Sequence, residues 1–181
     1  MKTLFTFRHA KSGWDQPALR DFDRALNAKG RRAATAMGRH LGNAGLTFDA
    51  VIASPALRVT QTLDAMFDGL GRRLSPGWDR RLYLASASTL LEVVQEAPDS
   101  ASTLLLAAHN PGIEELVLLL ASPTGEEEIR SQVGEKYPTA SFAELRFDVD
   151  RWADVNEGGG QLVRFVRPRD LDPALGPDAA S

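Results

Sequence analysis

The sequence has 181 residues, of which 43% are hydrophobic and 25% are charged, and it contains no cysteine. Disulfide bonds, zinc–thiolate sites and cysteine nucleophiles are therefore excluded. The net charge of −3 does not favour binding to nucleic acid or a polybasic contact with a membrane, so any positive potential must be local. We expect one globular domain over residues 1–181, in which about 170–181 form a mobile tail.

The apolar runs of the sequence are short. The run at residues 4–7 is too brief for the core of a signal peptide, and the aliphatic run at residues 116–121 is far below the roughly 20 residues that span a bilayer. We therefore expect a cytoplasmic protein with no membrane contact. No aliphatic stripe is left over that demands a second subunit, so we also expect a monomer.

The first part of the chain alternates between strand and helix patterns. Continuous apolar runs predict buried strands at residues 4–7 and 50–53. Between them, an apolar stripe that starts at Gly30 predicts a helix that ends at about residue 43. Ser54 followed by Pro55 predicts the start of the next helix, with the serine as N-cap and the proline as the first helical residue.

The middle of the chain continues this alternation. Thr89 and Glu92 have the spacing of a capping box, within a helix that we expect at about residues 88–97. The apolar run TLLLAA predicts a third buried strand at residues 103–108. A helix that is apolar nearly all round follows at about residues 112–121, and we expect it to be well buried.

The last third of the chain changes character. Residues 126–137 are charged and form either a loop or a short exposed helix, and two further strands are expected at residues 142–147 and 162–166, towards the edges of the sheet. The order of strands and helices predicts an α/β sandwich with right-handed crossovers. Ligands of such sheets bind beyond the carboxyl ends of the strands.

Basic and imidazole side chains stand at the carboxyl ends of the three predicted buried strands. Arg8 and His9 follow the first strand, Arg58 lies one helical turn after the second, and His109 follows the third. Two arginines can hold a phosphoryl dianion through charge-assisted hydrogen bonds. A neutral imidazole is a nucleophile near pH 7, and a second imidazole can donate to a phosphoryl oxygen.

Three motifs around these residues resemble those of the histidine phosphatase superfamily, which includes the cofactor-dependent phosphoglycerate mutases. Residues 8–12 (RHAKS) are similar to its Arg-His-Gly-x-Ser/Thr signature, although Ala10 replaces the glycine. Residues 54–62 (SPALRVTQT) resemble its Ser-x-x-x-Arg-x-x-Gln-Thr element, and residues 108–113 resemble its Gly-His-x-x-x-Ile element. The motifs occur in the family's order and each lies at a predicted strand end, which makes the resemblance specific.

Within the superfamily, residues 8–15, 21–30 and 80–86 are most similar to SixA-type phosphohistidine phosphatases. The resemblance implies a phosphoglycerate mutase-like fold, a three-layer α/β/α sandwich whose central sheet is mostly parallel and has an antiparallel edge strand. It implies that no metal ion or cofactor is needed. It also implies that one histidine is the nucleophile (His9) and that two arginines and the other histidine form the phosphate pocket (Arg8, Arg58, His109).

Two departures from the family pattern bear on the substrate. Many members carry a glutamate shortly after the segment equivalent to residues 81–82, to protonate an alkoxide leaving group, whereas residues 83–87 contain no carboxylate. A phosphoramidate needs such an acid less, because its imidazole leaves as a neutral species. Asp15 stands where mutase-like signatures commonly have asparagine. We interpret it as recognising or protonating the leaving group, or alternatively as a loop residue that pairs with Lys11.

Other polar residues near the motifs have weaker signals. Lys11 and Ser12 are candidate substrate contacts, and a solvated loop is the alternative for both. We interpret Asp21, Asp23 and Arg24 as residues that tether the loop that leads to Leu26 and Gly30.

A small basic cluster lies on or after the last predicted strand. It consists of Arg164, Arg167 and Arg169, and it is typical of a solvated edge. A docking surface for an acidic partner is the alternative.

The motifs favour a phosphatase that works through a phosphorylated His9. The expected substrate is a phosphohistidine-containing protein of the phosphotransfer or phosphocarrier type, or a small phosphorylated metabolite. A small-molecule phosphomonoesterase or a phosphoglycerate mutase-like enzyme is the alternative within catalysis. From another class, a weakly catalytic phosphoprotein-binding module remains open, although such modules commonly lose the nucleophile.

Overall fold

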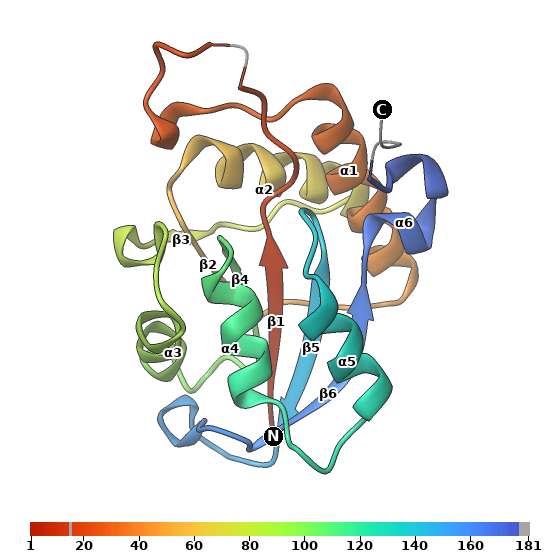
Figure 1. The fold of residues 1–181 in the computed structure, drawn as a ribbon. Helices are drawn as coiled ribbons and strands as arrows, with labels where there is room; N and C mark the ends of the chain where they lie inside the picture. Colours follow the sequence, from red (N-terminus) through yellow and green to blue (C-terminus); the bar gives the residue numbers. More distant parts are fainter. Residues whose placement is uncertain (15, 178–181) are drawn as a thin grey trace.

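The computed structural model describes residues 1–14 and 16–177, which are built around one mixed β-sheet (Figure 1). Its strands are β1 (Lys2–Arg8), β2 (Ala50–Ala53), β3 (Gly77–Trp78), β4 (Thr103–Ala108), β5 (Phe142–Phe147) and β6 (Gly160–Val166). They stand in the order β3-β2-β4-β1-β5-β6. The strands expected at residues 50–53, 103–108 and 142–147 are confirmed at those bounds, whereas no pattern predicts the two-residue β3.

The sheet is parallel on one side and antiparallel on the other. β2 pairs in parallel with β3 and β4, and β4 pairs in parallel with β1. β5 runs antiparallel to both of its neighbours, β1 and β6. The expectation of a mostly parallel sheet with antiparallel pairing at its edge is confirmed, with β5 as the reversed strand and β6 as the edge itself.

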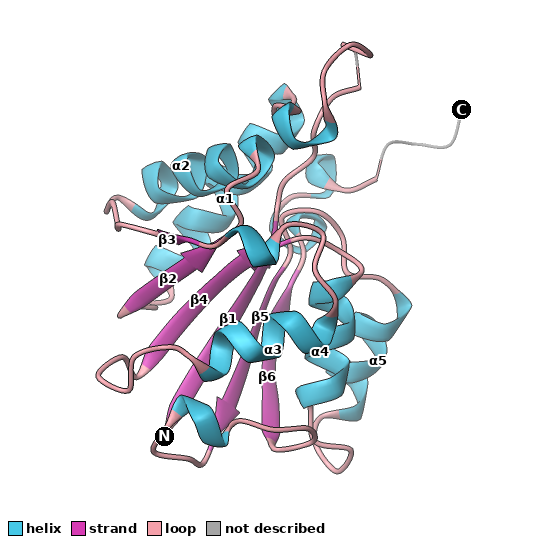
Figure 2. Cartoon of the chain, turned by 90° about the vertical axis from the view of Figure 1, so that its left-hand side faces the viewer, coloured by secondary structure: helices cyan, strands magenta, loops and turns pink. Residues whose placement is uncertain are grey.

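Helices cover both faces of the sheet, which gives three layers (Figure 2). The α-helices are α1 (Ala28–Asn43), α2 (Leu57–Leu70), α3 (Ala87–Gln95), α4 (Gly112–Leu120), α5 (Glu127–Glu135) and α6 (Pro168–Leu171). Short 3-10 turns are η1 (Asp21–Asp23), η2 (Arg80–Leu82), η3 (Trp152–Asp154) and η4 (Pro173–Leu175). α1 and α2 cover one face, and α3, α4 and α5 cover the other. Over the described residues, no helix is both long and apolar enough to cross a bilayer.

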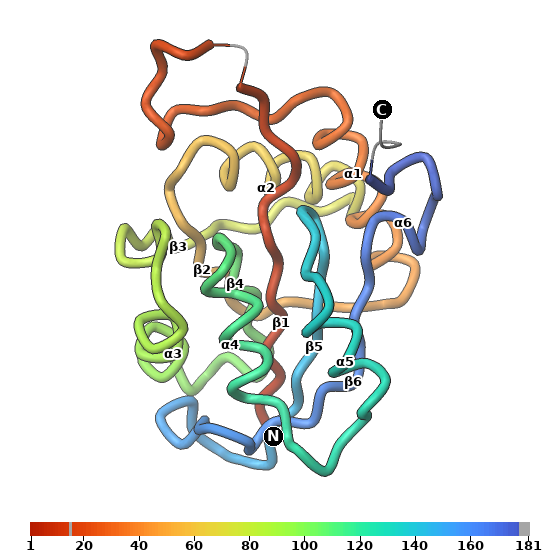
Figure 3. Tube along the Cα trace, in the orientation of Figure 1, coloured from red at the N-terminus to blue at the C-terminus, as the bar shows by residue number. Residues whose placement is uncertain are grey.

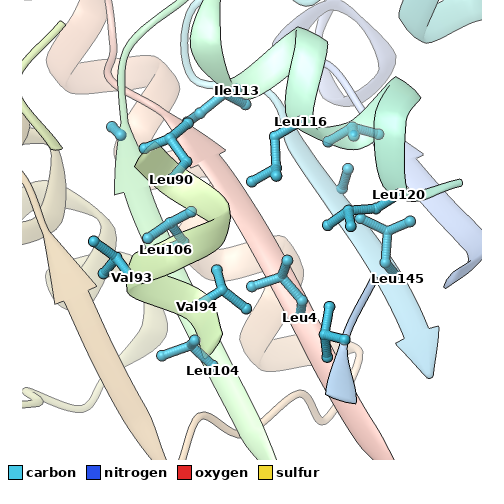
Figure 4. Close-up of a cluster of buried hydrophobic side chains, with 14 of the residues drawn as sticks. Leu4, Leu90, Val93, Val94, Leu104, Leu106, Ile113, Leu116, Leu120 and Leu145 are labelled. Carbon is cyan, nitrogen blue, oxygen red and sulfur yellow. The ribbon is translucent and has the colours of Figure 1, made fainter. Parts of the chain in front are cut away.

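Each face of the sheet has its own hydrophobic core. In β4, Leu104 and Leu106 belong to the cluster under α3 and α4, whereas Leu105 belongs to the cluster under α1 and α2. Figure 4 shows the first cluster, where side chains of α3 and α4, such as Leu90 and Leu116, point towards the sheet. A strand covered on both faces needs apolar residues throughout, which explains the unbroken apolar run that predicted β4.

α1 and α2 approach each other through glycines. A Cβ added to Gly38 of α1 would lie 2.0 Å from the carbonyl oxygen of Met66, and one added to Gly69 of α2 would lie 2.0 Å from that of Thr35. Side chains cannot be accommodated at such distances, so these two positions let the helix backbones pack directly on each other. The close packing holds α2 against α1 on one face of the sheet.

The predicted N-terminal caps of two helices are wrong. α2 begins at Leu57 with Ala56 as its N-cap, and not at Pro55 after Ser54. The Ser54 hydroxyl accepts a hydrogen bond from Ala56 N–H but also bonds to a histidine of the site described below, so it does not cap the first turn. α3 is capped by Ser86, whose hydroxyl accepts a hydrogen bond from the N–H of Thr89, and not by a capping box that starts at Thr89.

Residues 126–137 were expected to form either a loop or a short exposed helix. They contain α5, so the helix is the right alternative.

The end of the chain folds back towards α1. The end of α6 and the whole of η4 fall within residues 170–181, for which we expect a mobile tail, and α6 lies against α1. Figure 3 shows this path, with the segment between β1 and α1 looping above the carboxyl ends of the strands. Residues 178–181 and Asp15 lie outside the described residues, so mobility of the tail stays a prediction.

Candidate active site

A hollow of about 340 Å³ opens at the carboxyl ends of β1 and β4. The expected phosphate-site residues all line it, although they come from three segments of the chain (Arg8, His9, Arg58, His109). Because β4 lies between β1 and β2, the residues that follow these strands meet at one edge of the sheet. Lys11 and Ser12 also line the hollow, and their expected contact with substrate stays a prediction.

His9 is held in one tautomer by the backbone. Its Nδ1 lies 2.8 Å from the carbonyl oxygen of Ala10, and the side chain is 9% exposed. A carbonyl can only accept a hydrogen bond, so Nδ1 carries the proton. The lone pair of the neutral ring is therefore on Nε2, and because His9 lines the hollow, this nitrogen is the candidate nucleophile.

His109 lies beside His9, with the two ring centroids 5.3 Å apart. Its Nε2 is 2.8 Å from the Ser54 Oγ, which also accepts a hydrogen bond from the N–H of Ala56 at 3.3 Å. Ser54 is fully buried, so its hydroxyl proton has a partner only if it is donated to His109 Nε2. In this arrangement the proton of His109 is on Nδ1, which has no hydrogen-bond partner among the described residues.

Both imidazoles are neutral near pH 7. Burial lowers the pKa of His9 to about 3, and the positive charges of Arg8 and Arg58 act in the same direction. Burial likewise lowers the pKa of His109 to about 3, and His9 and Arg58 add to the shift. The site therefore places an uncharged lone-pair nitrogen beside an uncharged N–H donor.

Arg58 is oriented by a residue from the loop above the sheet. The guanidinium is buried, and its Nη1 and Nη2 donate to the backbone oxygen and the carboxylate of Asp21 at 2.8 and 3.0 Å. Tyr83 donates its hydroxyl proton to the same carboxylate. Burial raises the pKa of Asp21, but the hydrogen bonds from Tyr83 and two arginines outweigh it and lower that pKa to about 2. The carboxylate is thus charged throughout the neutral range.

Arg8 is held from the opposite side of the hollow. Its Nη1 donates to the carbonyl oxygen of Tyr137 at 2.8 Å, and the side chain of Asn110 donates to the same oxygen at 3.0 Å. The Nε of Arg8 is buried and has no partner among the described residues. A half-buried cation with a buried, unpartnered donor suits a site that binds an anion.

The Gln-Thr pair in the motif after Arg58 holds the nucleophile loop in place. The Thr62 hydroxyl accepts from the N–H of Ala10 at 2.8 Å and donates to the carbonyl oxygen of Arg58 at 2.5 Å. Gln61 accepts from the N–H of Leu26 at 2.9 Å. One side chain therefore links the backbone next to His9 with the first turn of α2.

The loop after β1 also packs on itself at the rim of the hollow. The guanidinium of Arg24 stacks on the ring of Trp14 at 3.3 Å and donates to the Ser12 hydroxyl and to Asp21. The tether expected from Asp21 and Arg24 is therefore present. Asp15 lies outside the described residues, so its expected role stays a prediction.

No carboxylate lines the described part of the hollow, and no metal-binding cluster is found among the described residues. None of the hollow's described lining residues is an aspartate or glutamate. Where many family members have glutamate, Tyr83 and Leu84 follow residue 82, and Leu84 lines the hollow. Over residues 1–14 and 16–177, no group of three or more His, Asp or Glu residues could hold a metal ion.

Three contributors to the site were not predicted as such. Ser54 was expected to cap a helix, Asp21 to tether a loop, and Tyr83 had no assigned role. Asp21 lies in the stretch 21–30 that carries the SixA resemblance, which is the signal that could have indicated it. The role of Ser54 depends on its distance to His109, and no sequence spacing reports that distance.

Comparisons with known proteins agree with the motifs. The family model of the histidine phosphatase superfamily (branch 1) matches residues 4–83. An uncharacterized protein of Mycobacterium tuberculosis, Rv1276c, is 36% identical over 164 residues, which are 90% of this chain and 99% of that protein.

Solved structures of SixA proteins have the same fold as this chain. The putative phosphohistidine phosphatase SixA from Nakamurella multipartitia is 31% identical, with a TM-score of 0.75 over 92% of this chain and 96% of that one. The protein histidine phosphatase SixA complexed with tungstate is 22% identical, with a TM-score of 0.76 over 94% of this chain and 99% of that one. At that identity the likeness concerns the fold, which is phosphoglycerate mutase-like.

Proposed function

The chain belongs to the histidine phosphatase superfamily, and from that premise we propose that it dephosphorylates phosphohistidine proteins through a phosphorylated His9. The family and the SixA-like neighbours support the coarser assignment, a phosphatase. One observation carries the role of His9 in this proposal. The backbone carbonyl of Ala10 holds the proton on Nδ1 of His9, so that Nε2 is a neutral nucleophile beside the buried Arg58 and the half-buried Arg8.

In the first step, His9 Nε2 attacks the phosphorus of the bound phosphoramidate. Arg8 and Arg58 hold the phosphoryl oxygens, and the N–H at Nδ1 of His109 donates to one of them as charge develops. A P–N bond forms to His9 while the P–N bond to the substrate imidazole breaks. The electron pair of the broken bond returns to the released nitrogen. The substrate imidazole leaves as a neutral ring because its other ring nitrogen already carries a proton, and the phosphoryl group remains on His9.

In the second step, water attacks the phosphorus of phosphorylated His9. The P–N bond breaks, inorganic phosphate is released, and the ring of His9 returns to its neutral form with the proton on Nδ1. No step needs a metal ion, since the two arginines balance the phosphoryl charge. The cycle therefore consumes one water molecule and yields the dephosphorylated protein and phosphate.

The choice of a P–N over a P–O substrate rests on the missing acid. An alkoxide is a poor leaving group and needs a proton donor, whereas the described lining of the hollow has no carboxylate. Asp21 does not serve as that donor, because its low pKa keeps it ionised and its oxygens are bonded to Arg58 and Tyr83. This supports phosphohistidine over a phosphate ester as the substrate.

The test compares leaving groups in the presence of EDTA. We expect much faster turnover of a phosphorylated histidine carrier protein and of phosphoramidate than of para-nitrophenyl phosphate or 3-phosphoglycerate. We expect His9→Ala to abolish both turnover and the trapped phosphoenzyme. The matched control is His40→Ala, which changes a histidine of α1 that does not line the hollow, and it should retain both. Faster turnover of the esters would assign the protein to the small-molecule phosphatases. Activity that EDTA removes would contradict the metal-free mechanism.

A further inference from the structure

A second hollow, also of about 340 Å³, adjoins the active site. Its walls come from the first turns of α1, the loop between α5 and β5, and the segment from residue 167 to residue 177. Arg8, Lys11 and Thr139 line both hollows, so the two are contiguous. In Figure 1 these walls lie on the β5–β6 side of β1, around α6. None of the proposed chemical steps uses this second hollow.

The second hollow is strongly basic. Its cationic lining residues are Arg8, Lys11, Lys29, Lys136, Arg167 and Arg169. Together the two hollows are lined by eight of the chain's 21 lysines and arginines, and by no aspartate or glutamate among the described residues, although the chain has 24 of these acids. In a chain with a net charge of −3, this is a local concentration of positive charge.

The expected basic cluster near the C-terminus is divided by the fold. Arg164 donates to the buried carboxylate of Glu144 at 3.0 Å and lies outside the hollow. Arg167 pairs with Asp170 at 2.9 Å, and it lines the hollow with Arg169. Arg169 and Lys136 are exposed side chains from two different elements. The fold therefore gathers cations from distant parts of the sequence beside the phosphate pocket.

The rim of the active site has a different character. Trp14 is 75% exposed and Leu84 is 57% exposed, and both line the first hollow but not the second. Exposed large apolar side chains at the mouth of a site are typical of surfaces that meet another protein. A small metabolite held entirely within the phosphate pocket would leave both of these side chains in water.

We propose that the second hollow receives an acidic segment of the phosphoprotein, whose aspartate and glutamate side chains lie next to the phosphohistidine in space. This proposal rests on the proposed function, in which the first hollow takes the phosphoryl group. It adds that the protein carrying this group is acidic beside its phosphohistidine. While the phosphoryl group enters the first hollow, carboxylates of the partner meet Lys136 and Arg169, and its apolar surface covers Trp14 and Leu84. The cations act on encounter and docking, since they do not touch the reacting atoms.

The decisive variant reverses two charges outside the catalytic set. For the double variant Lys136→Glu/Arg169→Glu, we expect kcat/KM for a phosphorylated histidine carrier protein to fall at least about tenfold, through KM, with kcat retained. Turnover of phosphoramidate, which has no acidic segment, should stay within about twofold of the parent. The matched control Arg31→Glu/Arg72→Glu changes two exposed arginines outside both hollows and should leave both substrates unaffected.

A binding assay separates this proposal from the proposed function. We expect a fluorescein-labelled octaglutamate peptide to bind the parent, measured by anisotropy, and to bind the double variant at least about tenfold more weakly, with affinity falling as salt rises. If the parent shows this binding but does not turn over phosphohistidine protein, the function fails and the acidic-segment site stands. Unchanged KM and unchanged peptide binding in the double variant would overturn the site. Displacement of the peptide by micromolar tripolyphosphate, with no change in KM for the protein, would assign the hollow to a small polyanion.

Discussion

A single hydroxyl group determines which nitrogen of His109 carries the proton. Ser54 accepts from a backbone N–H, so its own proton is left for His109 Nε2, and the ring must hold its hydrogen on Nδ1. His9 carries its proton on Nδ1 as well, but there the carbonyl of Ala10 accepts that proton, which leaves the lone pair of Nε2 for the ligand. Two identical side chains therefore present opposite hydrogen-bonding character to the same ligand.

Removing the Ser54 hydroxyl should slow the chemical step. In Ser54→Ala the ring of His109 is free to move its proton to Nε2, which turns the donor at Nδ1 into an acceptor that repels a phosphoryl oxygen. We expect kcat for phosphoramidate to fall by about tenfold or more, as when an oxyanion donor is lost, while Ser54→Thr retains activity. The ¹⁵N spectrum of His109 should show the change of tautomer.

The matched control is Ser141→Ala. Ser141 is equally buried, and its hydroxyl has no hydrogen-bond partner among the described residues. This variant should keep both kcat and the His109 spectrum. If Ser54→Ala also keeps the proton on Nδ1 and an unchanged kcat, Ser54 does not position His109.

The residues that carry the chemistry were predictable because of where they stand. His9 and His109 follow continuous apolar runs, and such runs indicate where strands end and where ligands bind. Asp21 and Ser54 were not predictable, since their roles depend on contacts with residues far along the chain (Arg58 and His109). Sequence patterns report local structure, whereas these contacts exist only in the folded molecule.

At the scale of elements, the contact between α1 and α2 depends on two small positions. Gly38 and Gly69 each face a backbone carbonyl of the other helix so closely that no Cβ fits. The same helices carry site functions at their first turns, since α2 presents Arg58 and Gly30 of α1 packs on the backbone of Lys11. A change in helix spacing is therefore transmitted to the phosphate pocket.

Adding one methyl group at this contact should destabilise the fold. For Gly38→Ala we expect the free energy of unfolding to fall by about 1–3 kcal/mol, the usual effect of overpacking, because the obstructing atom is backbone. In the control Gly134→Ala, on α5, the new Cβ meets only a Leu118 methyl at 3.9 Å. Higher helix propensity should then leave stability unchanged or raise it by up to about 1 kcal/mol. Urea denaturation measures both, and equal stability of the two variants would contradict the packing argument.

At the scale of the whole molecule, the two buried histidines make stability depend on pH. Their pKa values are about 3 in the folded protein, against 6.5 for an unperturbed ring. The unfolded chain therefore binds more protons between about pH 6.5 and 3, and stability is lost as the pH falls through this range. Asp21, with a pKa of about 2, adds its own loss only below about pH 4.

Urea denaturation between pH 7 and pH 4.5 tests this. We expect the free energy of unfolding to fall with acidification, by up to about 1.4 kcal/mol per pH unit for each histidine once the unfolded ring is charged. The double variant His9→Gln/His109→Gln should flatten the dependence. The same slope in parent and double variant would show that other groups cause the acid sensitivity.

The layered architecture was predictable from strand and helix order, and the basic hollow was not. The sandwich follows from alternating apolar runs and stripes, which are local signals. The hollow combines Lys136 with Arg169 and the first turns of α1, elements that meet only because the chain end folds back. In the sequence, Arg167 and Arg169 are typical of a solvated edge, because nothing nearby in the chain indicates that Lys29 and Lys136 lie beside them in the fold.

The pairing of β1 has a consequence for the order in which the protein matures. β1 is translated before its sheet neighbours, which are residues 103–108 and 142–147. The strand that precedes His9 therefore stays unpaired until these residues are made, and such distant pairings form slowly. A nascent chain that stops before Tyr137 also lacks the carbonyl that holds Arg8. We therefore expect no assembled pocket in an amino-terminal fragment that ends before residue 137.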